Sequence, residues 1–271
     1  MSDRQDGWVG EGTSLDRPNP ARIYDYLLGG HHNFAADRAA AEKTLETFPH
    51  AAEAAVSQRA FLRRAIDMFT GEGIDQFLDI GSGLPPAGNV HDLARATIPE
   101  ARVVYVDIDP VVIAHSSRML SAVPGVTIIE GDVRRPREIL EHEKVRDLID
   151  FDRPLALTMT SLFHFVIDDE LAFHSATTLI DAIAPGSYVA MSHGLREERN
   201  REEMEKAQED FKSAASTKVR SREEIARLFE GLELLEPGLV RAPLWRPEAP
   251  DDLLLDNPEA YTALVGVGRK P

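Results

Sequence analysis

The sequence contains no cysteine. This absence excludes disulfide bonds, thiolate nucleophiles and cysteine-based zinc sites, and it fits a protein of the reducing cytoplasm. The neighbouring His31 and His32 are not expected to form a metal site, because adjacent imidazoles on an extended backbone diverge and no third ligand stands at a suitable spacing. We therefore expect a cytoplasmic protein without a metal centre.

Long apolar runs and an excess of basic residues are also missing. No apolar run approaches the roughly 20 residues that span a bilayer, and the polar residues 1–20 hold no apolar signal-peptide core. Acidic residues outnumber Lys and Arg 46 to 30, which gives a net charge of −16. Since phosphate backbones and anionic lipids are bound by positive charge, we expect no nucleic acid and no membrane as partner. A small-molecule substrate is expected instead, and the oligomeric state is not indicated.

The first quarter of the chain carries helical signals and no strand pattern. Residues 1–17 are polar and predict a flexible tail, and residues 18–72 predict an N-terminal helical cap. Its first helix begins at Asn19-Pro20, because Asn is a good N-cap and Pro suits the first helical position. Two further helices are expected over residues 35–48 and 51–69. The apolar stripe of the third would consist of Val56, Ala60, Phe61, Ala65 and Met68.

From residue 73 onward the pattern predicts an α/β core that runs to residue 271. Short buried runs alternate with helical patterns, which indicates βαβ units and a parallel sheet. The expected strands are residues 76–80, 102–107, 126–130, 155–160, 187–191, 232–236 and 261–267. The expected helices between them are residues 89–96, 110–120, 137–148 and 169–183, an inserted charged helix over about 195–219, and a helix that begins with the capping box of Ser221 and Glu224.

Three loops follow consecutive strands of this core. The first, residues 79–83, is a glycine-rich turn whose free backbone N–H groups could face a ligand. Asp107 ends the next strand at the distance typical of an acid that binds ribose hydroxyls. Asp132 follows the third strand, where a carboxylate could accept from the amine of adenine. Turn or cap residues are the alternative for each loop taken alone. Because all three lie at carboxyl ends of strands, a nucleotide-like ligand is favoured.

The spacing of the glycines bears on which ligand this is. A dinucleotide-binding turn has a third glycine three residues after the second, but here residues 84–88 read Leu-Pro-Pro-Ala-Gly. Such a turn would seat a pyrophosphate poorly, whereas S-adenosylmethionine has no phosphate to seat. We therefore expect S-adenosylmethionine as the cofactor, with NAD as the weaker alternative.

The motifs FLDIGSG, VVYVDIDP and IIEGDV resemble those of class I S-adenosylmethionine-dependent methyltransferases. The leading RPNPARIYDYLLGGHHNF and the late LLEPGLV resemble a bacterial S-adenosyl methyltransferase family first described as a domain of unknown function. The resemblance implies a Rossmann-like, seven-stranded, mostly parallel sheet whose last strand is antiparallel. The cofactor-binding residues expected from it are Asp79, Gly81, Ser82, Gly83, Asp107, Ile108, Gly131, Asp132, Val133, Thr160 and Ser161.

The resemblance also places the methyl acceptor beside the loop after the fourth strand. His164 in that loop could act as a general base, or it could be a histidine packed among apolar neighbours. The further substrate-pocket candidates, which could equally be structural, are Tyr24, His31, Asn33, Phe34, Phe163 and His193. The expected function is methyl transfer to an O or N nucleophile of a small molecule. A non-catalytic sensor of S-adenosylmethionine or S-adenosylhomocysteine is the first alternative, and an NAD-dependent oxidoreductase is the second.

Overall fold

A computed structural model describes residues 16–84, 89–197, 202, 205, 206, 209, 211–248 and 254–271. Most of the predicted tail, the proline pair at residues 85–86 and a large part of the predicted helix over 195–219 lie outside the described residues.

Three helices open the described chain, as predicted: α1 (Pro20–Leu27), α2 (Ala35–Thr47) and α3 (Ala51–Gly71). The side chain of Asn19 caps α1 by accepting from the backbone N–H groups of Ala21 and Arg22. The predicted stripe of α3 is wrong at Val56, which is 39% exposed. The helix is rotated so that its buried apolar residues are Ala55, Phe61, Leu62, Ala65, Ile66 and Phe69.

Seven strands form one sheet in the order β3-β2-β1-β4-β5-β7-β6. Their bounds are β1 (Gln76–Ile80), β2 (Arg102–Asp107), β3 (Val126–Glu130), β4 (Ala156–Met159), β5 (Tyr188–Gly194), β6 (Glu233–Leu234) and β7 (Ala263–Arg269). The first five pair in parallel, and β7 is antiparallel to both β5 and β6. The predicted fold class is therefore confirmed. The strand expected over residues 232–236 is reduced to two residues.

The helices of the core cross between the strands. They are α4 (Val90–Thr97), α5 (Pro110–Leu120), α6 (Pro136–Glu141), α7 (Glu143–Leu148), α8 (Asp169–Ala182) and α10 (Arg222–Arg227). The single helix predicted over residues 137–148 is wrong, because His142 has an extended backbone and its side chain accepts from the N–H of Lys144 to begin α7. The capping box of Ser221 and Glu224 is confirmed at the start of α10.

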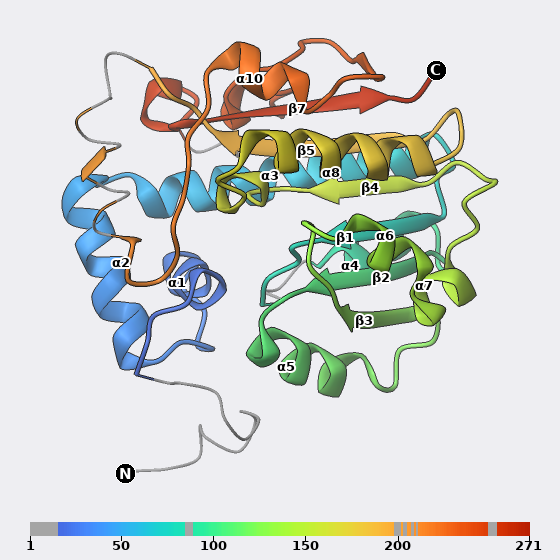
Figure 1. Ribbon diagram of the computed structural model, residues 1–271, viewed down its shortest axis with the longest axis horizontal. Coiled ribbons are helices and arrows are strands. Elements are labelled where there is room, and N and C mark those ends of the chain that lie inside the picture. The colour runs from blue at the N-terminus through green and yellow to red at the C-terminus, as the bar shows by residue number, and fades with distance from the viewer. Residues whose placement is uncertain are drawn as a thin grey trace.

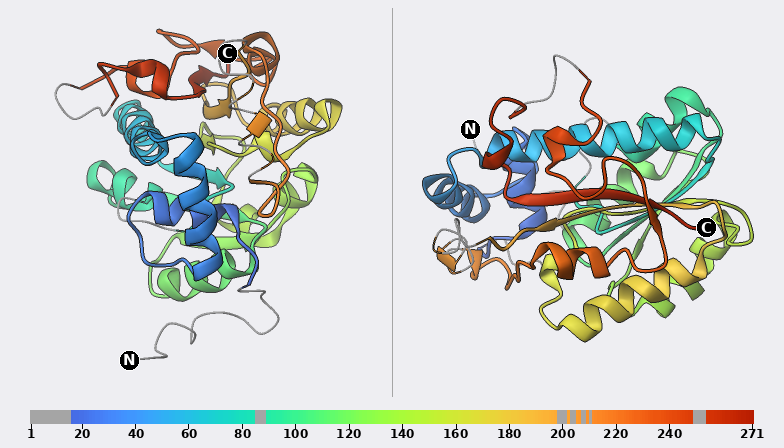
Figure 2. Two further views of the ribbon diagram at one scale, coloured as in Figure 1. Left: turned by 90° about the vertical axis from the view of Figure 1, so that its left-hand side faces the viewer. Right: turned by 90° about the horizontal axis from the view of Figure 1, so that it is seen from above.

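Helices lie against both faces of the sheet (Figure 2). On β1, Phe77 packs in a cluster with residues of α3, α4 and α5, while Leu78 packs in a cluster with residues of α6, α7, α8 and α10. The period of two that is inherent in a strand explains this division. Asp79 follows Phe77 by two positions and so faces the layer that contains α3.

The parallel strands end on the side of the molecule where α1 and α2 lie (Figure 1). The amide of Asn19 donates to Asp109, which itself caps α5 immediately after β2. The start of α1 is thus fastened to the carboxyl end of β2. Since α3 packs into the same hydrophobic cluster as β1 and β2, we propose that only α1 and α2 act as a cap and that α3 belongs to the core.

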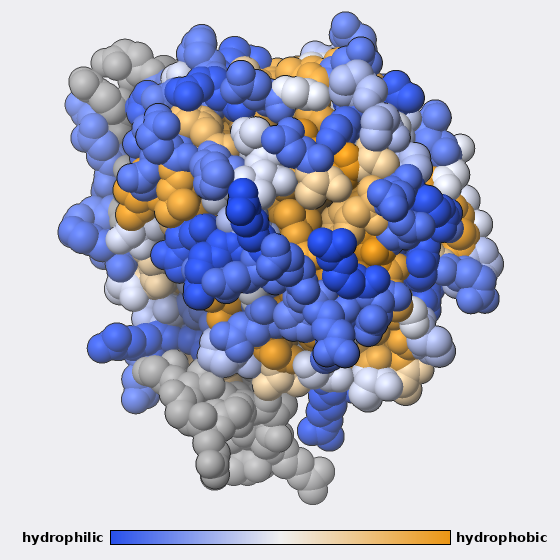
Figure 3. All heavy atoms as spheres, turned by 45° about the vertical axis from the view of Figure 1, so that its right-hand side comes forward, coloured by the Kyte–Doolittle hydropathy of each residue, from blue (hydrophilic) through white to orange (hydrophobic). Residues whose placement is uncertain are grey.

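Hydrophilic side chains cover most of the face shown in Figure 3, with hydrophobic residues exposed in small groups. Within the described residues, no helix is long and apolar enough to cross a bilayer.

Candidate active site

The glycine turn after β1 folds over the end of β2. Gly81 and Gly83 both have positive φ values, of 76° and 64°, which a side chain would disfavour. The N–H groups of Gly81 and Ser82 donate to the carbonyl of Val106 at 2.8 and 3.2 Å. A Cβ on Gly81 would lie 2.8 Å from Leu162 of the loop after β4. The turn therefore needs glycine both for its backbone conformation and for close packing.

Asp107 joins the end of β2 to this turn. One carboxylate oxygen accepts the N–H of Gly83 at 2.8 Å and the other accepts the N–H of Asp109 at 2.9 Å. Burial raises the pKa of Asp107, and the hydrogen bonds from Asp109 and Gly83 oppose that rise. A carboxylate has about four acceptor sites, so Asp107 keeps capacity for ligand hydroxyls. Asp109 is the N-cap of α5, with Pro110 at its first position.

The loop after β3 lies beside the end of β2. The N–H of Gly131 donates to the carbonyl of Asp107 at 2.9 Å, and a Cβ on Gly131 would lie 2.6 Å from Val106. The carboxylate of Asp132 is held by the side chain of Arg134, with N–O distances of 2.7 to 3.0 Å. The neighbouring Val133 is buried. Asp132 thus already has an ionic partner at the position where adenine recognition was predicted.

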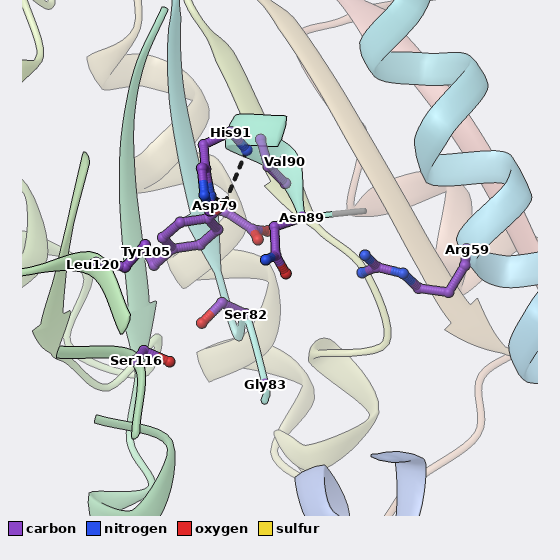
Figure 4. A pocket seen from close by; sticks show the side chains of 10 residues that line it. All are labelled: Arg59, Asp79, Ser82, Gly83, Asn89, Val90, His91, Tyr105, Ser116 and Leu120. Atoms are coloured by element: carbon purple, nitrogen blue, oxygen red, sulfur yellow. Dashed lines mark hydrogen bonds between the residues drawn. The ribbon is translucent and has the colours of Figure 1, made fainter. Parts of the chain in front are cut away.

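A narrow cavity adjoins the glycine turn on the α3 side of the sheet. The residues that line it are Arg59, Asp79, Ser82, Gly83, Asn89, Val90, His91, Tyr105, Ser116 and Leu120 (Figure 4). Burial raises the pKa of Asp79 to about 6, although a hydrogen bond of 2.5 Å from Thr158 opposes that rise. Among the described residues, the buried Oγ of Ser82 has no hydrogen-bond partner.

The loop after β4 contains Thr160, Ser161 and the predicted base His164. Ser161 has a φ of 53°, a strained conformation for a residue other than glycine, and its N–H donates to the Oγ of Ser192 at 2.8 Å. The ring of His164 lies 4.3 Å from that of Phe165 between centroids, and its buried Nδ1 has no hydrogen-bond partner in the part of the chain that is described. Burial lowers the pKa of His164 to about 3, with smaller contributions from His193 and Arg220.

His193 is held by a fully buried arginine. The Nδ1 of His193 donates to the carbonyl of Gly194 at 2.8 Å, which leaves Nε2 to accept from Arg220 at 2.8 Å. Arg220 also donates to the carbonyls of Phe163 and Val166 and pairs with Asp169. Burial lowers the pKa of His193 to about 4. Both ring nitrogens are therefore occupied within the protein, and the predicted pocket role of His193 is not supported by this geometry.

The other substrate-pocket candidates differ in their burial and contacts. The hydroxyl of Tyr24 donates to the carbonyl of Ala55 on α3 at 3.1 Å, and burial raises its pKa to about 12. His31 is exposed, and Phe34 lies 5.4 Å from the guanidinium of Arg22. Phe163 is buried in the core cluster on the other face of the sheet. These contacts favour structural roles for Tyr24 and Phe163.

The remaining candidate, Asn33, reveals a residue that the sequence analysis missed. The amide of Asn33 and the N–H of His32 both donate to the buried carboxylate of Asp25 at 2.8 Å. A Cβ on Gly30 would overlap with Oδ1 of Asp25. Asp25 therefore orders the loop between α1 and α2, and the second glycine of the motif makes room for it. The spacing of an acid five residues before Gly30 was the signal available in the sequence.

A family model described as S-adenosyl methyltransferase matches residues 8–271. The chain belongs to this family. It is an S-adenosylmethionine-dependent methyltransferase with S-adenosylmethionine as cofactor. The NAD-dependent alternative is thereby set aside. No protein of curated function matches the sequence.

Two solved structures resemble the methyltransferase over nearly its whole length. A candidate methyltransferase from Thermobifida fusca YX is 39% identical, with a TM-score of 0.89 over 97% of this chain and 99% of that chain. A DUF574 family protein from Streptomyces avermitilis MA-4680 is 35% identical, with a TM-score of 0.88 over 95% and 100%. An O-methyltransferase family protein from Burkholderia thailandensis shares the fold at 12% identity, with a TM-score of 0.51 over 82% of this chain and 58% of its own.

The described residues at the carboxyl ends of β1 and β2 fit this cofactor. Ser82 offers a buried hydroxyl that lacks a partner within the described chain, and Asp107 offers unused acceptor sites. The side chain of Ile108 is 51% exposed next to Asp107, which leaves an apolar surface for a ring to contact. Among the described residues, a Cβ on Gly83 would meet only Ala21 of α1, at 4.0 Å, which leaves room beside Gly83 beneath the start of α1.

Proposed function

We propose that this methyltransferase transfers a methyl group to an O or N nucleophile of a small molecule in the cytoplasm. The observation that carries the proposal is the cover over the glycine turn. The start of α1 is hydrogen-bonded to Asp109, and Ala21 stands 4.0 Å from the position of a Cβ on Gly83. A site that lies beneath a fastened helix suits a small acceptor, and the net charge of −16 disfavours a nucleic acid.

The residues proposed to bind the cofactor come from adjacent strands in the sheet. Asp107 would accept from ribose hydroxyls, and Ile108 and Val133 would contact the adenine, with Gly131 and Asp132 at its edge. The residues proposed for the methionine end are Asp79, Gly81, Ser82, Gly83, Thr160 and Ser161. When bound, S-adenosylmethionine supplies an electrophilic methyl group on a positively charged sulfur.

On the acceptor side, we propose that His164 orients the nucleophile. Its Nδ1 is buried without a partner in the described chain, so it is suited to accept a hydrogen bond from an O–H or N–H group. A pKa lowered to about 3 makes the imidazole a weak base at neutral pH. Orientation is then the larger contribution, since methyl transfer depends mainly on alignment of the nucleophile with the sulfonium.

The test is methyl transfer to a metabolite extract from S-adenosylmethionine that carries a deuterated methyl group. The expected result is a small molecule that gains the labelled methyl group, detected by mass spectrometry, only when active protein is present. Tight binding of the cofactor without any labelled product would favour the sensing alternative. Label found in nucleic acid or protein would contradict a small-molecule acceptor.

A further inference from the structure

The cavity beside the glycine turn has a strongly basic side chain that the proposed function does not use. Among the described lining residues, Arg59 is the only arginine or lysine. It projects from α3 toward Asp79 and Asn89 (Figure 4). An arginine that faces a cavity beside the glycine turn from a core helix suggests an anionic ligand group, because its fork of N–H donors matches a carboxylate.

The positive charge of Arg59 affects three neighbouring ionisable groups. Burial is the main cause that raises the pKa values of Asp79, Tyr105 and Tyr24, and the positive charge of Arg59 opposes the rise at all three. These residues lie on β1, β2 and α1, respectively. The charge of Arg59 is therefore close enough to β1, β2 and α1 to affect ionisable groups on all three.

The chemistry of the cofactor matches this arrangement. The amino-acid end of S-adenosylmethionine carries one carboxylate and one ammonium group. The cavity places a cation, Arg59, and a buried acid, Asp79, among its walls, and Ser82 adds a buried hydroxyl without a partner in the described residues. Arg59 on α3 and Asp79 on β1 thus carry charges opposite to those of the carboxylate and the ammonium group of the cofactor.

We propose that Arg59 binds the carboxylate at the amino-acid end of the cofactor, with Asp79 facing the ammonium group. The site would then bind ligands that carry this amino-acid end more tightly than ligands that lack it. This inference rests on the proposed cofactor site. It assigns to α3 a binding role in addition to its packing role.

The test compares two ligands by calorimetry with the full-length chain. S-adenosylhomocysteine carries the amino-acid end, and 5′-methylthioadenosine lacks it but keeps the nucleoside. In the Arg59→Gln variant, the affinity for S-adenosylhomocysteine is expected to fall about tenfold to a hundredfold, as when hydrogen bonds to a charged group are lost. The affinity for 5′-methylthioadenosine is expected to stay unchanged, which also shows that the variant is folded.

Arg63→Gln is the matched control. Arg63 lies one turn further along α3, is partly exposed and pairs with Asp67 and Glu248. Both affinities should be unchanged in this variant. Arg59→Lys keeps the charge but not the fork, so a smaller loss that is confined to S-adenosylhomocysteine would support the proposal even if Arg59→Gln does not fold.

Two results would overturn the inference while leaving the cofactor site intact. One is an unchanged affinity of Arg59→Gln for S-adenosylhomocysteine, and the other is an equal loss for both ligands. If the unaltered protein binds neither ligand, the proposed cofactor site itself is wrong and the inference falls with it.

Discussion

The carboxylate of Asp107 accepts the N–H of Gly83 at 2.8 Å, across 24 positions of sequence. The acid at the end of β2 thus fastens the turn that follows β1. The same side chain is proposed to hold the ribose, so the shape of the turn and the binding of the cofactor depend on one residue.

Replacement of Asp107 tests this double role. Asp107→Ala is expected to weaken cofactor binding by about 1.5–3 kcal/mol, because hydrogen bonds to a charged group are lost. Calorimetric titration with S-adenosylhomocysteine measures the change. Glu130→Ala is the matched control, since Glu130 ends the neighbouring β3 and is exposed. An unchanged affinity in folded Asp107→Ala would count against the ribose role.

The buried Asp79 predicts a pH dependence of stability. Its pKa is raised by burial to about 6 in the folded protein, against about 3.9 in an unfolded chain. The folded state therefore favours the protonated acid. The preference for protonated Asp79 raises the free energy of unfolding by about 2–3 kcal/mol relative to high pH. This stabilisation is fully present below a pH of about 4 and is lost as the pH rises through about 6.

Asp79→Asn is neutral at every pH and retains an acceptor for Thr158. The variant is expected to gain stability relative to the unaltered protein as the pH rises from about 4 to about 7. Urea denaturation at both pH values, without cofactor, measures the difference between the two proteins. The prediction fails if that difference is the same at the two pH values.

The two glycines between α1 and α2 predict different costs of substitution. Gly29 has a φ of 75° and, among the described residues, no atom within 4 Å of the position that a Cβ would take, so Gly29→Ala should cost about 1–2 kcal/mol through its backbone alone. Gly30→Ala would collide with Asp25 and disturb its buried hydrogen bonds, for a cost of about 2–4 kcal/mol. Thermal and urea unfolding compare the two. Equal costs would show that Asp25 does not depend on Gly30.

His164 is expected to stay neutral over the physiological pH range. An unperturbed histidine has a pKa of about 6.5 and would titrate near neutral pH. Because burial lowers the pKa of His164 to about 3, its imidazole resonances should not titrate between about pH 5 and 8. Nuclear magnetic resonance of the labelled ring measures this, and His164→Gln assigns the signal. A midpoint near neutrality would instead restore the general-base hypothesis.

Local rules were sufficient for much of the fold and for part of the site. The caps at Asn19 and Asp109 follow from residues next to one another in sequence, and the strand-turn pattern around Gly81 and Asp107 places two loops at one edge of the sheet. The break at His142 was not predictable from periodicity, since apolar spacing continues through it while the side chain caps a new helix.

The missed residues depend on packing between distant elements. Arg59 is half-buried on the same face of α3 as the buried Ala55 and Leu62, but only the docking of α3 brings it to a cavity beside β1. Arg220 meets His193 because the chain returns to pair with Leu195 after the inserted segment. Neither contact follows from a local pattern.

The contact between Asp25 and Gly30 also bears on how relatives of this chain can diverge. Any side chain at position 30 needs the space that the carboxylate of Asp25 occupies, and a shorter residue at position 25 would leave the N–H of His32 without its acceptor. Substitutions at the two positions are therefore expected to occur together, and an alignment of family members would reveal them as a covarying pair. Such a pair would identify the loop between α1 and α2 in sequences where the glycine doublet has been lost.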